Sequence, residues 1–144
     1  MHDIRIIEIP DCKMVSSGTG MFGEEKFDAF HAWFSSLPRT IFPKDFLFMD
    51  GGGFHWLYLY EAGMQVPQGY AVIDFSGGLY AVATDIDGET DIAALDAVRD
   101  VFLAANGFEV DESRQRLGNV ITTPLACKIL GYNQMDYYTP IKAR

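Results

Sequence analysis

The chain has 144 residues, of which 49% are apolar and 22% charged, and its formal net charge is −9. This length and composition predict one globular domain with a buried core. The acidity excludes a nucleic-acid-binding surface, which needs clustered Lys and Arg. No apolar run approaches the roughly 18–20 residues of a membrane span, and MHDIRIIEIP does not resemble a signal peptide. We therefore expect a cytoplasmic protein without a membrane partner.

The first half of the chain predicts two strands, a helix and two more strands. Residues 4–9 and 12–17 are the first two strands, separated by Pro10 and Asp11. A helix opens at Glu24 and Glu25, with an apolar stripe at helical spacing made by Phe27, Phe30, Phe34 and Leu37. Residues 46–49 and 54–61 are the next strands, and the glycine run 51–53 reads as a hairpin tip rather than a phosphate loop.

The second half repeats this order. Strands are predicted at 70–75 and 79–84, followed by a helix that either Asp87 or Thr90 caps and that carries Leu95, Val98 and Phe102 on one face. Residues 108–116 are expected to be irregular, 117–122 to form a strand, and 124–130 a short helix that ends at Gly131. The last strand is predicted at 135–141.

This repetition predicts an α+β fold of two pseudo-repeated strand–strand–helix–strand–strand modules with mostly antiparallel pairing. The modules span about 3–61 and 69–142 of a single domain, 1–144. We expect a central cleft between them, because a seam between similar halves is a natural place for a ligand.

No nucleophile–base, phosphate-loop or metal-ligand pattern occurs in the sequence. GxSxG and GxGxxG patterns are absent. Cys12 and Cys127 lie far apart and predict two reduced, partly buried thiols rather than a zinc site. His31 and His55 are interpreted as structural or surface histidines. No cofactor and no metal are expected.

The most informative feature is the aromatic strand FHWLYLYE at 54–61. Alternation places Phe54, Trp56, Tyr58 and Tyr60 on one face and His55, Leu57 and Leu59 on the other. Any single ring is more often part of a core than of a site. Together with Tyr80, Tyr132, Tyr137 and Tyr138, these rings suit a pocket for flat or cationic organic molecules. Glu61 and Asp136 are the nearby carboxylates, and either is also consistent with a solvated charge at a strand end.

Several segments, in this order, resemble the GyrI-like small-molecule-binding domains of AraC-type and MerR-type regulators. They are IRIIEIPDCKMVSSG, EEKFDAFHAWF, FPKDFLF, GGFHWLYLY, VPQGYAVIDFSGGLYAVA, LGNVIT and GYNQMDYYTPIK. The resemblance implies a Rob/SOUL-type, SHS2-like fold and an aromatic pocket for hydrophobic, often cationic compounds. It also implies a pocket tyrosine, matched here by Tyr138, and a pocket glutamate, whose position Arg116 occupies. The ligand-binding candidates are thus Phe48, Trp56, Tyr58, Tyr80, Arg116 and Tyr138.

Three functions follow as hypotheses, of which the first is favoured. The chain is a multidrug-type sensor or sequestering domain in transcription regulation, binding a small organic ligand without catalysis. Alternatively it hydrolyses a reactive small molecule, with Glu61 and either Tyr58 or Tyr138 as the acid/base pair. Finally, it is a protein-binding module for DNA gyrase or for a separate DNA-binding subunit.

Overall fold

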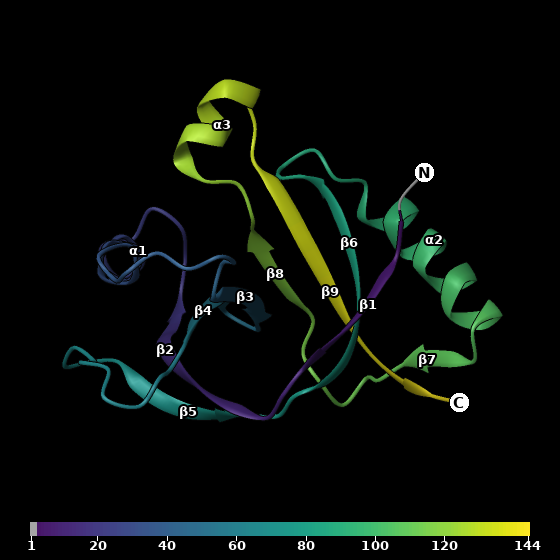
Figure 1. Cartoon of the computed structure of the whole chain (residues 1–144), viewed down its shortest axis with the longest axis horizontal. Helices are drawn as coiled ribbons and strands as arrows, with labels where there is room; N and C mark the ends of the chain where they lie inside the picture. The colour runs from purple at the N-terminus through teal and green to yellow at the C-terminus, as the bar shows by residue number, and fades with distance from the viewer. Residues whose placement is uncertain (1–2) are drawn as a thin grey trace. The chain divides into compact units, whose positions relative to one another are not determined.

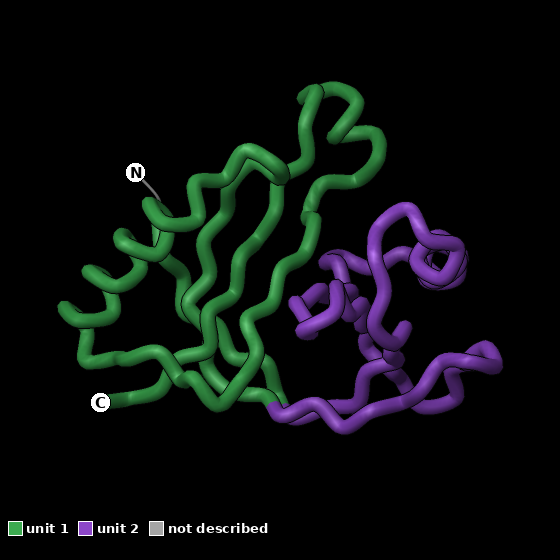
Figure 2. Tube along the Cα trace, turned by 180° about the vertical axis from the view of Figure 1, so that it is seen from behind, with its two compact units in different colours: residues 1–10, 77–144 green, residues 11–76 purple. Residues whose placement is uncertain are grey.

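The computed structural model describes residues 3–144 and has the predicted α+β class, with nine strands, three helices and antiparallel pairing within each of two compact units. Unit 1 comprises the described residues up to Pro10 together with Gly77–Arg144, and unit 2 comprises Asp11–Ser76 (Figure 2). Unit 1 is therefore discontinuous in sequence, because the first strand of the chain belongs with the second half.

Unit 2 is a four-stranded sheet covered on one face by a helix. Its elements are β2 (Cys12–Gly20), α1 (Glu25–Ser35), β3 (Asp45–Asp50), β4 (Gly53–Leu59) and β5 (Ala71–Phe75), and the strand order is β3-β4-β2-β5. The apolar stripe of α1 forms as predicted, with Phe27 and Phe30 fully buried in a cluster with side chains of β2 and β4. Figure 1 shows α1 beside these strands. Burial of these rings supplies the hydrophobic free energy that holds α1 on the sheet.

The predicted alternation of β4 is confirmed. Trp56 and Tyr58 join the cluster under α1, while His55 lies on the opposite face. Strand β2 runs three residues beyond its predicted end and carries an irregularity in its pairing with β4 between Ser16 and Thr19. Gly18 adopts a φ of 74° there, a conformation that a residue with a Cβ rarely takes.

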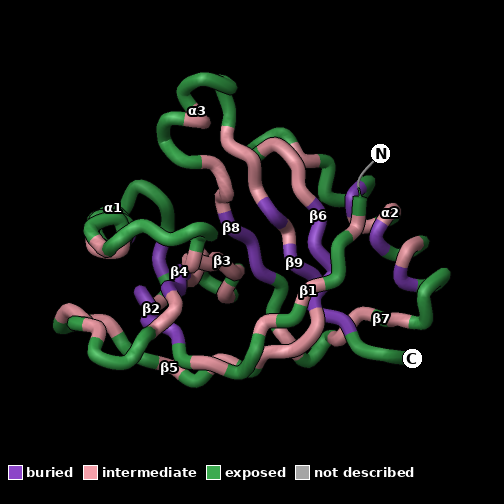
Figure 3. Tube along the Cα trace, in the orientation of Figure 1, coloured by how far each residue is buried: buried purple, intermediate pink, exposed green. Residues whose placement is uncertain are grey.

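Unit 1 is also a four-stranded sheet with one long helix. It contains β1 (Arg5–Ile9), β6 (Gly78–Ile86), α2 (Ile92–Ala105), β7 (Phe108–Val110), β8 (Leu117–Val120), α3 (Pro124–Leu130) and β9 (Gln134–Ala143). The strand order is β1-β6-β9-β8, and β7 pairs with the end of β9. Helix α2 packs through Leu103 on Ala81 and Ile141, and buried stretches lie on β6, β8 and β9 (Figure 3).

In unit 1 the predicted bounds of α3 are confirmed, whereas the predicted cap of α2 and the irregular segment after it are corrected. Helix α2 is capped by Asp91, whose side chain accepts a hydrogen bond from the Ala94 amide, so the prediction of Asp87 or Thr90 was wrong. Residues 108–110 form a strand rather than an irregular segment, because β9 extends far enough to pair with them. Helix α3 begins and ends as predicted, with Thr123 as its cap and Gly131 in the left-handed conformation at φ 86°.

The internal repeat is confirmed in the order of the strands. Unit 2 reads β5-β2-β4-β3 and unit 1 reads β1-β6-β9-β8, with the helix following the second strand in each case. The first strand of each half pairs with the second strand of the other half, since β1 pairs with β6 and β5 with β2. The short links at Pro10–Asp11 and Ser76–Gly77 are therefore not hairpin turns.

Within residues 3–144, none of the helices combines the length and the apolar composition needed to cross a membrane.

Candidate functional site

A pocket of about 430 Å³ lies in unit 2, between the end of α1 and the segment that follows β4. Its volume falls in the range of about 300–1,000 Å³ that is usual for small-molecule sites. The wall combines apolar groups with one phenol and two opposite charges. The residues that define it are Leu37, Pro38, Lys44, Tyr58, Glu61 and Met64.

Backbone hydrogen bonds bring the polar residues of this pocket together. The Leu59 amide donates to the Lys44 carbonyl at 3.0 Å, which places the residue before β3 beside the end of β4. Two residues later the chain turns, because the Met64 amide donates to the Glu61 carbonyl at 3.0 Å. Glu61 and Lys44 consequently face each other across the pocket edge, although 17 positions separate them in the sequence.

Tyr58 forms the aromatic part of the wall. Its ring stacks on Phe34 with centroids 5.3 Å apart and meets the edge of Trp33 at 5.9 Å. Burial raises the pKa of the Tyr58 phenol, against a smaller opposing effect of the Lys44 ammonium. The phenol is therefore protonated at neutral pH and offers one hydrogen-bond donor and an acceptor.

Lys44 and Glu61 form an ion pair at the edge of the pocket. The hydrogen bond with Glu61 raises the pKa of the Lys44 ammonium, so Lys44 carries its positive charge at neutral pH. The Glu61 side chain is 56% exposed, and exposed pairs of this kind contribute only about 0–1 kcal/mol. Either partner can therefore exchange this contact for a charged ligand at little cost.

Asp45 lies next to Tyr58 in the β3–β4 register and is a half-buried acid in aromatic surroundings. Its Oδ2 accepts a hydrogen bond from Trp56 Nε1 at 3.1 Å. Burial nevertheless raises the pKa of the Asp45 carboxyl, because the loss of hydration outweighs the stabilising bond. This indole–carboxyl contact fixes the orientation of Trp56 beside the pocket residue Tyr58.

The predicted ligand residues of unit 2 divide between the two faces of its sheet. Trp56 and Tyr58 lie on the α1 face, and Trp56 is a core residue, with its ring centroid 5.5 Å from that of Phe27 and 5.2 Å from that of Phe34. Phe48 lies on the opposite face, where it stacks on His55 at 4.7 Å. Of these predicted residues, Tyr58 lines the pocket together with the predicted acid Glu61.

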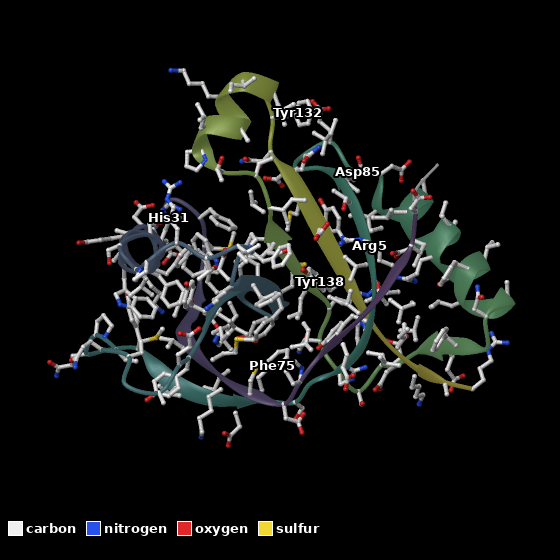
Figure 4. The ribbon with its side chains drawn as sticks, viewed as in Figure 1. Arg5, His31, Phe75, Asp85, Tyr132 and Tyr138 are labelled. Carbon is white, nitrogen blue, oxygen red and sulfur yellow. The ribbon has the colours of Figure 1, made fainter. Side chains whose placement is uncertain are left out.

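The predicted residues of unit 1 also lie on different faces. Tyr80 and Tyr138 share the face opposite α2, with ring centroids 6.1 Å apart. Tyr138 belongs to β9 and is labelled in Figure 4. Arg116 lies on the α2 side, where its Nη1 contacts Asp96 Oδ2 at 3.2 Å. Asp136 is buried and paired with Arg5 at 2.9 Å, which excludes the alternative that it is a solvated charge at a strand end. Glu61, by contrast, is exposed.

Arg114 is a cation beside the predicted ligand residue Tyr80 that the sequence did not indicate. Its guanidinium lies over the Tyr80 ring at 4.8 Å and donates to the carbonyl oxygens of Leu79 and Ile141, each at 2.8 Å. Tyr80 therefore already holds a cation from its own chain. No local pattern marks its contacts with Leu79 and Ile141, because these residues lie 35 and 27 positions away.

Among residues 3–144, no group of three or more His, Cys, Asp or Glu side chains is placed to hold a metal ion. Cys12 and Cys127 are free and half-buried, as predicted. Burial is the main cause that raises the pKa of the Cys12 thiol, so this thiol is protonated at neutral pH.

No protein-family model matches the chain, and no curated protein matches its sequence. Solved structures match it in fold. The C-terminal domain of EcmrR has a TM-score of 0.64 and 8% identity over 100% of this chain and 99% of that domain. EcmrR in complex with DNA has a TM-score of 0.67 and 9% identity over 99% of this chain, and the chain spans 58% of that protein.

Two structures from Listeria innocua are similar as well. One is an uncharacterized conserved protein, with a TM-score of 0.66 and 11% identity over 96% of this chain and 92% of that one. The other is described as a hydrolase, with a TM-score of 0.65 and 11% identity over 96% and 91% of the two chains. At these identities the comparisons establish the fold, which is the α+β fold that the sequence predicted.

Proposed function

We propose that the chain binds small hydrophobic, aromatic organic molecules, including cations, as a ligand-sensing domain of the GyrI-like type. The observation that carries this proposal is the pocket of about 430 Å³ lined by Tyr58, Leu37 and Met64 beside the Lys44–Glu61 pair. A flat ring packs against such a wall with favourable loss of apolar surface. The Tyr58 hydroxyl and the Glu61 carboxylate then orient a polar or cationic substituent.

A role in transcription regulation is part of this proposal. It is supported by the shared fold with the C-terminal domain of EcmrR, a protein whose structure has been solved in complex with DNA. In this view a ligand-binding domain of this size acts together with a DNA-binding polypeptide. Assignment to the AraC family, binding to DNA gyrase, and ligand contacts at Phe48, Trp56, Tyr80, Arg116 and Tyr138 stay predictions.

Tryptophan fluorescence tests the proposal directly, because Trp33 touches Tyr58 at 5.9 Å and reports on the pocket. We expect saturable quenching when planar aromatic cations, such as acridine dyes, and neutral naphthalene derivatives are titrated. Tyr58→Ala should weaken binding by about tenfold or more, in keeping with about 1–3 kcal/mol for losing a stacked ring. Tyr132→Ala, on the exposed surface of unit 1, is the matched control.

The charge preference gives a second, independent measurement. Lys44→Met removes the ammonium that neutralises Glu61, so it should strengthen the binding of aromatic cations and weaken that of aromatic anions. Glu61→Gln should do the opposite. If neither variant alters the ratio of cation to anion affinity, or if no compound quenches the wild-type protein, the pocket is not the binding site.

A second candidate function is hydrolysis of a reactive small molecule. It is favoured by one observation, the presence of the Tyr58 phenol and the Glu61 carboxylate on the wall of the same pocket. The pairing of Glu61 with Lys44 opposes it, because a general base must be free to take a proton. Hydrolysis of strained electrophiles by the wild-type protein that is lost in both Tyr58→Phe and Glu61→Gln would establish this alternative.

A further inference from the structure

The face of the unit 2 sheet opposite α1 carries a hydroxyl, an imidazole and a carboxylate in one chain of contacts. The Ser16 hydroxyl is hydrogen-bonded to His55 Nε2, and His55 Nδ1 lies 3.3 Å from Asp50 Oδ2. We propose that Ser16, His55 and Asp50 form a nucleophile–base–acid triad that accepts acyl groups from activated esters. Such triads are defined by geometry and role, not by sequence order, so the absence of a GxSxG motif does not exclude one.

The local fold explains how these three residues meet. Ser16 lies where the β2–β4 register shifts, and the shift sets its side chain against His55 rather than against a direct neighbour in the ladder. Asp50 is the last residue of β3, at the glycine hairpin that returns the chain to β4. The Phe48 ring stacks on the imidazole at an interplanar angle of 14° and holds its plane.

The contacts of His55 fit the tautomer that a general base requires. With the proton on Nδ1 and directed to Asp50, the Nε2 lone pair accepts the Ser16 hydroxyl proton. Asp50 also accepts a hydrogen bond from the Thr19 hydroxyl at 2.5 Å. Hydrogen bonds from Thr19 and His55 lower the pKa of the Asp50 carboxyl, so it is ionised at neutral pH and able to stabilise an imidazolium.

Burial and neighbours indicate the class of substrate. Ser16 is only 4% exposed, and Met14 and Leu57 on the same face are fully buried. The neighbours of Ser16 on this face are therefore apolar, which favours an apolar acyl group over a charged one. The Gly18 amide donates a hydrogen bond to Ser16 Oγ at 3.1 Å, so a backbone N–H lies beside the oxygen to which the acyl carbon bonds.

The proposed step balances without any further reactant. Ser16 Oγ forms a bond to the acyl carbon of an ester while its proton passes to His55 Nε2. The bond from that carbon to the leaving oxygen then breaks, and His55 returns the proton to the departing alcohol. This leaves an acyl-Ser16. Water then attacks the acyl carbon while His55 takes a proton from it, the bond from that carbon to Ser16 Oγ breaks, and His55 returns the proton to Ser16 Oγ as the carboxylic acid leaves.

The full-length chain tests this inference. A fluorophosphonate probe, followed by intact-mass measurement and peptide mapping, should give one adduct, on Ser16. His55→Gln should slow that labelling by about a hundredfold or more, the usual contribution of a general base, and Ser16→Ala should abolish it. Ser36→Ala, an exposed hydroxyl of the same unit, should label at the wild-type rate.

The result with the wild-type protein decides the matter even where a variant fails to fold. No adduct on Ser16, or an adduct only at another residue, overturns the triad and identifies the three contacts as a structural hydrogen-bond network. Labelling of Ser16 that continues unchanged in folded His55→Gln also overturns it. None of these outcomes depends on ligand binding in the Tyr58 pocket, which lies on the other face of the sheet.

Discussion

Replacing Arg114 by Met should strongly destabilise unit 1. The Arg114 side chain is only 14% exposed, and its guanidinium spans the ends of β6 and β9 by donating to Leu79 and Ile141. A further contact joins its Nε to Asp111 Oδ2 at 3.0 Å. Met preserves the apolar length of the side chain but leaves these acceptors without their donor.

The expected loss in the free energy of unfolding is about 3–5 kcal/mol. Hydrogen bonds to charged groups contribute about 1.5–3 kcal/mol each and are not additive, and removing one partner of a buried charged network costs about 3–5 kcal/mol. Arg114→Lys keeps the positive charge but not the planar guanidinium with its several donors, so its loss in the free energy of unfolding should be intermediate.

Urea unfolding followed by circular dichroism measures this loss, with Arg116→Met as the matched control. Arg116 is 52% exposed and has one ion pair with Asp96, so its replacement should cost about 0–1 kcal/mol. If the free energy of unfolding of Arg114→Met lies within about 1 kcal/mol of the wild-type value, the hydrogen bonds of the guanidinium to β6 and β9 do not stabilise unit 1, which contradicts the prediction.

Four further predictions follow from the same structure. Phe30→Ala, in the fully buried core of unit 2, should cost about 3–5 kcal/mol, whereas Phe42→Ala at a 76% exposed position should be nearly neutral in urea unfolding. Gly131→Ala should cost about 1 kcal/mol, since φ is 86° there, and a melting temperature unchanged from wild type would contradict this. Burial raises the pKa of Asp45 above 3.8, its value in the unfolded chain, so the folded state binds this proton more tightly. The free energy of unfolding should therefore fall as pH rises through the folded pKa. Asp45→Asn should remove this fall when melting temperatures are measured across pH. The pKa of Asp111 is lowered to about 2, mainly by hydrogen bonds from Ser113 and Arg114. Its contribution to the free energy of unfolding is therefore complete above about pH 4 and is lost towards pH 2. Asp111→Asn should reduce the dependence of melting temperature on pH in this acidic range.

The elements that depend on local periodicity could be predicted from the sequence. Steps of three and four residues between Phe27, Phe30 and Phe34 specify one helix face, and two of these rings are fully buried. Strict alternation in residues 54–59 likewise specifies the two faces of β4. In both cases the pattern and the burial are properties of the same short segment.

Pairing between distant strands could not be predicted in the same way. The links at Pro10–Asp11 and Ser76–Gly77 have the length of hairpin turns, yet β1 pairs with β6 and β2 with β5. Strand β7 was missed because a three-residue strand has no periodicity of its own and exists through its pairing with β9. Contacts across such sequence distances are decided by the burial of whole strands.

The same limit applies to the candidate site. Tyr58 and Glu61 could be named because they belong to the aromatic strand or follow it directly. Lys44 could not, since it lies just before β3 and reaches the pocket through a backbone hydrogen bond with Leu59 of β4. The Ser16–His55–Asp50 contacts depend on the irregularity in β2, and a register shift leaves no mark in the alternation of either strand.

Three neighbouring residues of β4 now have three separable roles, which follow from the period of two in a strand. Trp56 fills the core under α1, Tyr58 lines the pocket on that same side, and His55, which directly precedes Trp56, faces the other way towards Ser16. A substitution at His55 therefore acts on the hydroxyl–imidazole contact without entering the pocket, and one at Tyr58 acts on the pocket without touching that contact. Because the two residues lie on opposite faces, the proposed ligand binding and the proposed acyl transfer should be lost independently, and a variant that abolishes both has lost the sheet rather than a site.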